Sequence, residues 1–160
     1  MPSNEKDKLT PTDRVGELFS VQLLMLMFGF FLYHQLADTG FFTDEFGFVE
    51  MLALYGPLFL AMDAPVVRAI TGRKNPARPF DAFANICLVV GTFWLLEVFP
   101  LDYTHLADAL PKFLRFILSW VTDDMARIVF VIMIVVNSIT AVVNLVRFVT
   151  FPRTPSRMLS

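Results

Sequence analysis

The sequence predicts an all-α polytopic membrane protein: a four-helix transmembrane bundle with an additional interfacial amphipathic helix between the third and fourth spans. Two observations predict this class. Hydrophobic residues make up 56% of the 160 residues and charged residues 18%, which is more apolar surface than a soluble core of this size can bury. The apolar residues are also grouped into four long runs with few charges, each near the length that crosses a bilayer.

The first span is expected over residues 18–37, which contain no Asp, Glu, Lys or Arg. Residues 1–17 are polar and are expected to form a cytoplasmic tail, in which Thr12 is a candidate helix N-cap. A secretory signal peptide would have a positively charged N-terminal region and a small residue three positions before its cleavage site. The lead here is balanced by acids, so we expect an uncleaved span.

The second span is expected over residues 46–62, at the short end of what can cross. Pro57 has no amide proton to donate, which predicts a kink within the membrane. Asp63 is then expected to cap a brief interfacial helix that Gly72 ends. A continuous helix over 46–70 is the alternative.

The third span is expected over residues 80–99, after a basic turn rich in proline, and the fourth over 128–149, where Thr122 is a good helix start. Between them, residues 104–120 carry apolar side chains at helical spacing opposite polar ones. This pattern predicts a helix on the outer surface of the membrane. A re-entrant loop, or a helix packed over the mouth of the bundle, is the alternative.

The distribution of Lys and Arg predicts the orientation, because cytoplasmic loops retain these residues. Three precede the first span, four lie between the second and third, and three lie at the C-terminal end, of which Arg147 is within the last turn of the fourth span; only three of the 13 fall on the other side. We therefore expect a multi-pass protein of the plasma (inner) membrane with both termini cytoplasmic. The transmembrane domain is then 18–151, and 152–160 form a cytoplasmic tail.

Four ionisable residues lie within or beside the spans and are candidates for an ion pathway: Glu50, Asp63, Glu97 and Arg147. All four are near span ends, where a charge costs less and long side chains can reach the headgroups. Glu50 and Glu97 could share a proton at the outer end. Asp63 could neutralise Arg147 at the inner end.

A polar stripe is expected on the fourth helix, where Asn137, Thr140 and Asn144 recur at helical spacing. Such residues commonly form hydrogen bonds between membrane helices. Asn85 on the third helix and Gln22 on the first could supply partners. The stripe is interpreted as a helix–helix interface in preference to a path for a solute.

His34 and His105 are the two histidines, both on the predicted outer side. Two axial imidazoles could hold a haem, and one could ligate the magnesium of a pigment. Histidines at membrane interfaces are common without either ligand, and the sequence has no c-type haem attachment motif. No cofactor and no metal site are therefore expected.

No phosphate loop, nucleophile elbow, zinc helix motif or potassium filter is found in the sequence, so an enzyme is not expected. A net charge of −2 also argues against nucleic acid as a partner. The leading hypothesis is a non-catalytic accessory or structural subunit, whose partners are the lipid bilayer and other membrane subunits or a second copy. A small oligomeric transporter or channel that uses the intramembrane carboxylates is the alternative. A haem- or pigment-binding membrane subunit is the third.

Overall fold

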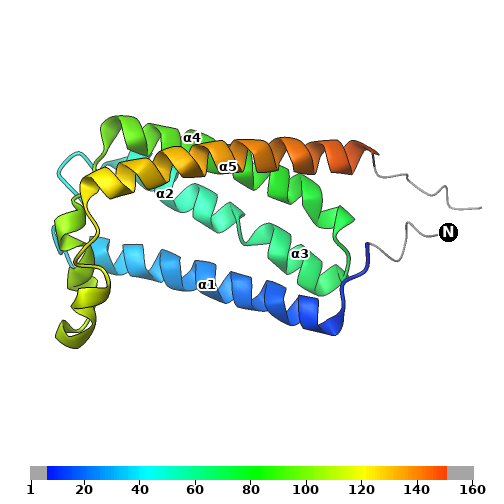
Figure 1. Cartoon of the computed structure of the whole chain (residues 1–160), viewed down its shortest axis with the longest axis horizontal. Helices are drawn as coiled ribbons and strands as arrows, with labels where there is room; N and C mark the ends of the chain where they lie inside the picture. The colour runs from blue at the N-terminus through cyan, green and yellow to red at the C-terminus, as the bar shows by residue number, and fades with distance from the viewer. Residues whose placement is uncertain (1–6, 151–160) are drawn as a thin grey trace, which may run out of the picture.

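The computed structural model describes residues 7–150, which fold almost entirely as helices (Figure 1). Four helical stretches are long and apolar enough to cross a membrane, as predicted: Pro11–Leu36, Phe48–Thr71, Asn75–Val98 and Asp123–Thr150. The tail predicted over 152–160, and the first six residues of the tail predicted over 1–17, lie outside the described residues.

Helix α1, Pro11–Leu36, begins before the start of the span predicted over 18–37. The predicted cap at Thr12 is wrong, because Thr10 is the N-cap. Its Oγ1 accepts a hydrogen bond from the amide of Asp13, whose carboxylate accepts one from the amide of Thr10. This reciprocal pair, followed by proline at the first helical position, favours a start at residue 11.

The second stretch is broken into helix α2, Phe48–Leu60, and helix α3, Asp63–Thr71. Helix α2 continues past Pro57, so the break lies after the proline. The predicted capping role of Asp63 is wrong: Met62 occupies the N-cap position, and Asp63 belongs to the first turn of α3. Gly72 ends α3 with a left-handed φ of 63°, as predicted.

The other two long stretches each contain one continuous α-helix. A short 3₁₀ helix, Asn75–Ala77 (η1), leads into helix α4, Arg78–Val98. Helix α5 is Asp123–Thr150, and Thr122 caps it by accepting a hydrogen bond from the amide of Met125. The predicted start of the fourth helix at Thr122 is therefore confirmed.

The single helix predicted over 104–120 does not form. Two 3₁₀ helices take its place, Tyr103–Ala109 (η2) and Lys112–Ile117 (η3). Leu110 between them is extended, with φ −95° and ψ 148°. The cause is Pro111, because the ring of a proline clashes with a helical conformation of the residue before it.

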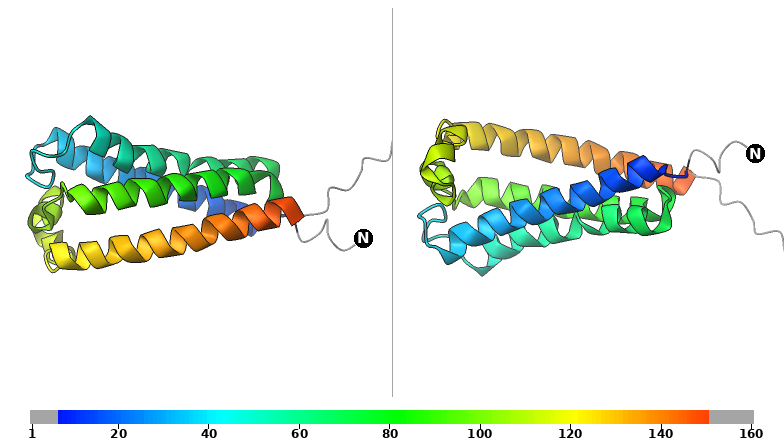
Figure 2. Two further views of the ribbon diagram at one scale, coloured as in Figure 1. Left: turned by 90° about the horizontal axis from the view of Figure 1, so that it is seen from above. Right: turned by 90° about the horizontal axis from the view of Figure 1, so that it is seen from below.

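The two ends of the described chain lie together at one end of the molecule, called here the terminal end; η2 and η3 lie at the opposite end (Figure 1). Helix α4 lies between α2 and α5 and makes its most extensive contacts with these two (Figure 2). Helix α1 packs mainly on α3.

The chain before α1 is tied to the loop before α4. The amide of Leu9 donates to the carbonyl of Gly72, and the amide of Lys74 donates to the carbonyl of Asp7. The Asp7 carboxylate also accepts from the amide of Asn75 at 2.7 Å. Asp7 and Leu9 are both buried, so these contacts fix the loop at the terminal end.

Candidate functional site

A polar pocket of about 220 Å³ lies at the terminal end, between α1 and α3 on one side and α4 and α5 on the other. We call it the terminal pocket. Its lining side chains come from all four spans and from the loop before α4: Glu17, Arg68, Lys74, Arg78, Asp81, Asn144 and Arg147. With four cations and two carboxylates, this lining carries a formal charge of +2.

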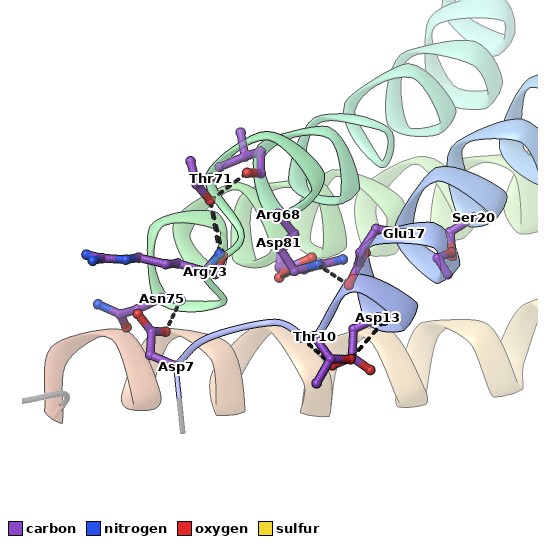
Figure 3. Close-up of polar contacts among 12 residues, drawn as sticks. Asp7, Thr10, Asp13, Glu17, Ser20, Arg68, Thr71, Arg73, Asn75 and Asp81 are labelled. Carbon is purple, nitrogen blue, oxygen red and sulfur yellow. Dashed lines mark hydrogen bonds and ion pairs between the residues drawn. The ribbon is translucent and has the colours of Figure 1, made fainter. Parts of the chain in front are cut away.

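Arg68, one of the cations of the terminal pocket, lies between Glu17 and Asp81 (Figure 3). Its Nε lies 2.8 Å from Glu17 Oε1, and its Nη1 lies 2.6 Å from Asp81 Oδ2. The three side chains are each about one-fifth exposed. These two ion pairs connect α3 to α1 and to α4, and burial of this degree makes the loss of one partner costly.

The loop before α4 and the end of α5 supply the other cations. Arg78 Nη1 donates to Asn75 Oδ1 at 3.3 Å and to the carbonyl of Arg147 at 2.9 Å, so it links the loop to α5. Among the ion pairs of residues 7–150, neither Lys74 nor Arg147 has a carboxylate partner. Both residues line the pocket and contribute positive charge to it.

The predicted carboxylate pair is not brought into contact. Glu50 is buried, and its Oε1 accepts from Trp94 Nε1 at 2.9 Å. Its Oε2 accepts from the amide of Gly47 at 3.0 Å, which caps α2. Glu97 is exposed, and no hydrogen bond between it and Glu50 is found within residues 7–150.

The predicted inner ion pair has not formed either. Asp63 and Arg147 make no ion pair with each other in the described part of the chain. Arg147 lies instead at the terminal pocket. The cation that is neutralised at this end is Arg68, by two carboxylates from other helices.

The predicted helix–helix interface residues mostly bond within their own helices. Asn137 donates to the carbonyl of Met133 and Thr140 to that of Val136, both at 2.7 Å. On α4, Asn85 likewise donates to the carbonyl of Asp81. The two others are Asn144, which lines the terminal pocket, and Gln22, which is exposed.

A polar contact that sequence reasoning missed joins α1 to α2. The hydroxyl of Tyr55 donates to Gln35 Oε1 at 2.9 Å, and Gln35 Nε2 donates to the sulfur of Met51. The sequence gives little indication of this contact, because nothing in it shows that a Gln near the end of one span and a Tyr within the next are neighbours. The Arg68 cluster had a stronger signal, since Glu17, Arg68 and Asp81 all lie near the same predicted membrane surface.

The two histidines lie at the end opposite the terminal end. His34 is fully buried and its Nδ1 is hydrogen-bonded to Thr39 Oγ1. Among residues 7–150, its Nε2 makes no hydrogen bond. The rings of Phe30 and Phe41 pack against it, with centroids 4.8 and 4.7 Å away. The adjoining pocket measures about 180 Å³, below the roughly 300 Å³ at which small-molecule sites begin. These residues therefore do not fit a haem.

His105 belongs to a separate surface cluster with Asp108 and Arg115. Its Nδ1 lies 2.9 Å from Asp108 Oδ2, and Arg115 Nη1 lies 2.7 Å from Asp108 Oδ1. The hydrogen bond from His105 is the main reason that the pKa of Asp108 is lowered from its usual value, and the charge of Arg115 adds to the effect.

Two apolar grooves run along the flanks of α4. The α2/α4 groove has a volume of about 490 Å³ and is lined by Val49, Leu52, Ala53, Gly56, Pro57, Leu60, Ile86, Cys87, Val90, Gly91 and Trp94. The α4/α5 groove has a volume of about 270 Å³ and is lined by Ile86, Val89, Val90, Ser138, Ala141, Val142 and Leu145. Ile86 and Val90 line both grooves, so they form a ridge between them. We call the ridge and its two grooves the packing face.

No protein-family model matches this sequence, and neither the curated proteins nor the solved structures include a match. Function is therefore inferred from the residues of this chain. The terminal pocket and the packing face are the features from which function is inferred: the first is polar and cationic, and the second is apolar.

Proposed function

We propose that this chain is a non-catalytic accessory subunit of a membrane complex, which docks through its packing face onto a transmembrane helix of another polypeptide. The observation that carries the proposal is the ridge of Ile86 and Val90 with an apolar groove on either side. Membrane helices associate by fitting the ridges of one into the grooves of another.

The dimensions and chemistry of the α2/α4 groove favour a helix as its occupant. On α2 the lining extends from Val49 to Leu60, a length of about 18 Å or three helical turns. Gly56 faces open space, since a Cβ atom there would have no neighbour within 4 Å. Small residues at such a position let two helix backbones approach closely.

The polar side chains within the spans support a packing role, because they act inside the chain. Glu50 caps α2 and accepts from Trp94 on α4. Asn137 and Thr140 bond to their own helix. Each of these contacts stabilises the chain itself and leaves the apolar packing face to meet a partner.

We place the four spans as a transmembrane bundle in the plasma (inner) membrane, with the terminal end in the cytoplasm. The excess of Lys and Arg at that end supports this orientation. The η2–η3 segment then rests at the outer interface, where exposed Phe113, Phe116 and Trp120 suit the headgroup region.

Reporter fusions at Thr43, Asn75 and Ser160 test this orientation: Thr43 is expected outside and the other two inside. An outward result at Asn75 or Ser160 overturns the orientation.

A photoreactive side chain placed at Gly56 tests the docking proposal, with Gly29 on α1 as the matched control. At both glycines an added Cβ atom meets nothing within 4 Å, so the two positions are matched in their freedom to carry a side chain. We expect position 56 to give one discrete adduct with a single other polypeptide, and position 29 to give none.

The leucine variants complete this test. Gly56→Leu fills the groove and is expected to release the chain from the complex, whereas Gly29→Leu leaves it bound. The proposal is wrong if both variants behave alike, if position 56 reacts with lipid alone, or if its adduct has the mass of two copies. Ion flux in liposomes that hold this chain alone, abolished by Glu50→Gln, would favour a transporter instead.

A further inference from the structure

We propose that the terminal pocket binds a phosphate group, supplied by an anionic phospholipid of the surrounding leaflet. This site is separate from the packing face and does not depend on the docking of a partner. Its support comes from the charge of the pocket, from the fixed backbone of the loop before α4 and from the position of the pocket at the ends of the helices.

The charge of the pocket favours an anion. Arg68 is balanced by Glu17 and Asp81, which together exceed its charge by one. The other three cations of the lining reverse this excess and leave the pocket at a formal +2. Among residues 7–150, no carboxylate forms an ion pair with Lys74 or Arg147, and the charge of Lys74 acts on the exposed Asp13 only from beyond ion-pair distance. A phosphate oxygen would provide an ion-pair partner, as Lys and Arg bind phosphate by charge-assisted hydrogen bonds.

The loop that carries Lys74 is held in place by Asp7, whose carboxylate bonds to Asn75 (Figure 3). The amide of Lys74 is bonded to the carbonyl of Asp7, and the amide of Asn75 to its carboxylate. Asn75 in turn accepts a hydrogen bond from Arg78. Pre-organised groups lose less entropy on binding, so this network favours a specific site over a diffuse basic surface.

The location of the pocket indicates a lipid as the source of the phosphate. Arg68 lies in the last turn of α3, Arg78 is the first residue of α4, and Arg147 lies in the last turn of α5. When these helices cross a bilayer, their ends lie at the depth of the headgroups. The start of α4 has no side-chain cap, and the positive end of its dipole adds to the attraction for an anion.

The test measures lipid binding to the purified full chain by native mass spectrometry. The probes are phosphatidylglycerol, phosphatidylcholine and inorganic phosphate. We expect one phosphatidylglycerol to bind more tightly than phosphatidylcholine, and inorganic phosphate to bind far more weakly. The double variant Lys74→Gln/Arg147→Gln should weaken phosphatidylglycerol binding about 10- to 30-fold, at the usual contribution of a cation near a membrane surface.

The matched control removes the same two charges from the opposite end, as Lys112→Gln/Arg127→Gln, and should bind phosphatidylglycerol like the parent chain. Circular dichroism checks that both double variants fold. An equal loss in both would mean a general effect of charge and would overturn the site. Equal binding of the two lipids would also overturn it, and inorganic phosphate binding as tightly as the lipid would overturn the lipid source.

Discussion

Gly91 of α4 lies so close to Ala53 of α2 that a Cβ atom on Gly91 would be 2.3 Å from the Ala53 carbonyl oxygen. That carbonyl is the one to which Pro57, four residues later, has no amide proton to donate. The proline therefore changes the internal bonding of α2 at the place where the two backbones meet. Because Gly91 has no side chain, the backbone of α4 can approach the backbone of α2 closely at this point.

We predict that Gly91→Ala destabilises the protein by about 1 to 3 kcal/mol, because the added methyl group forces α2 and α4 apart. Thermal unfolding in detergent, followed by circular dichroism, measures this. Gly29→Ala is the control, since a Cβ atom there meets nothing within 4 Å. Alanine should leave that site unchanged or raise its stability by up to about 1 kcal/mol. Equal destabilisation by both variants would contradict the close contact.

We predict that Arg68→Gln lowers the free energy of unfolding by about 1 to 3 kcal/mol, since it leaves Glu17 and Asp81 near each other without their shared cation. The value lies below that of a fully buried pair because these side chains are one-fifth exposed. The second variant, Asp81→Asn, removes one of the two carboxylate charges that Arg68→Gln leaves without a cation. Arg68→Gln/Asp81→Asn should therefore lose less stability than the two single variants together; strictly additive losses would show that the pair is not coupled.

The spans were predictable because each is an apolar run with a recognisable stop or start, such as Gly72 or Thr122. The segment after the third span was not, although the reason was present in the sequence. Apolar spacing over 104–120 fits a helix, but Pro111 in its middle excludes helical geometry at Leu110. The spacing of apolar residues predicts one helix, but the steric clash between Pro111 and the residue before it decides the structure.

The pairing of charged residues depends on which helices are neighbours and which faces they share, and one sequence contains little of that information. Glu50 and Glu97 were matched by depth alone. In the structure, Trp94, one turn before Glu97, is the residue of α4 that contacts Glu50. Depth along a span is thus predictable from sequence, whereas rotation about the helix axis is set by contacts such as that of Gly91 with Ala53.

We predict that Trp94→Phe lowers the unfolding temperature, because the carboxylate of Glu50 loses a hydrogen-bond donor. Trp120→Phe is the matched control. The indole of Trp120 is 62% exposed and donates to the carbonyl of Ile117 in its own segment. Its loss should change the unfolding temperature little. If the two variants shift it equally, the bond between Trp94 and Glu50 does not connect the helices energetically.

We predict that the stabilising effect of Asp108 depends on pH. Its pKa in the folded chain is lowered, chiefly by the hydrogen bond from His105. A lowered pKa means that the stabilising contribution of the Asp108 carboxylate is present above the unfolded-state pKa, near 4, and is lost as the pH falls through the folded-state pKa.

Asp108→Asn should therefore lower the unfolding temperature by about 2 °C at pH 7, a small shift for a partly exposed group. The difference from the parent chain should shrink as the pH falls below about 4. Asp44→Asn removes an exposed acid of the same end that makes no ion pair among residues 7–150, and it serves as the control at pH 7. A difference at Asp108 that persists unchanged at pH 3 would mean that its charge is not what stabilises the cluster.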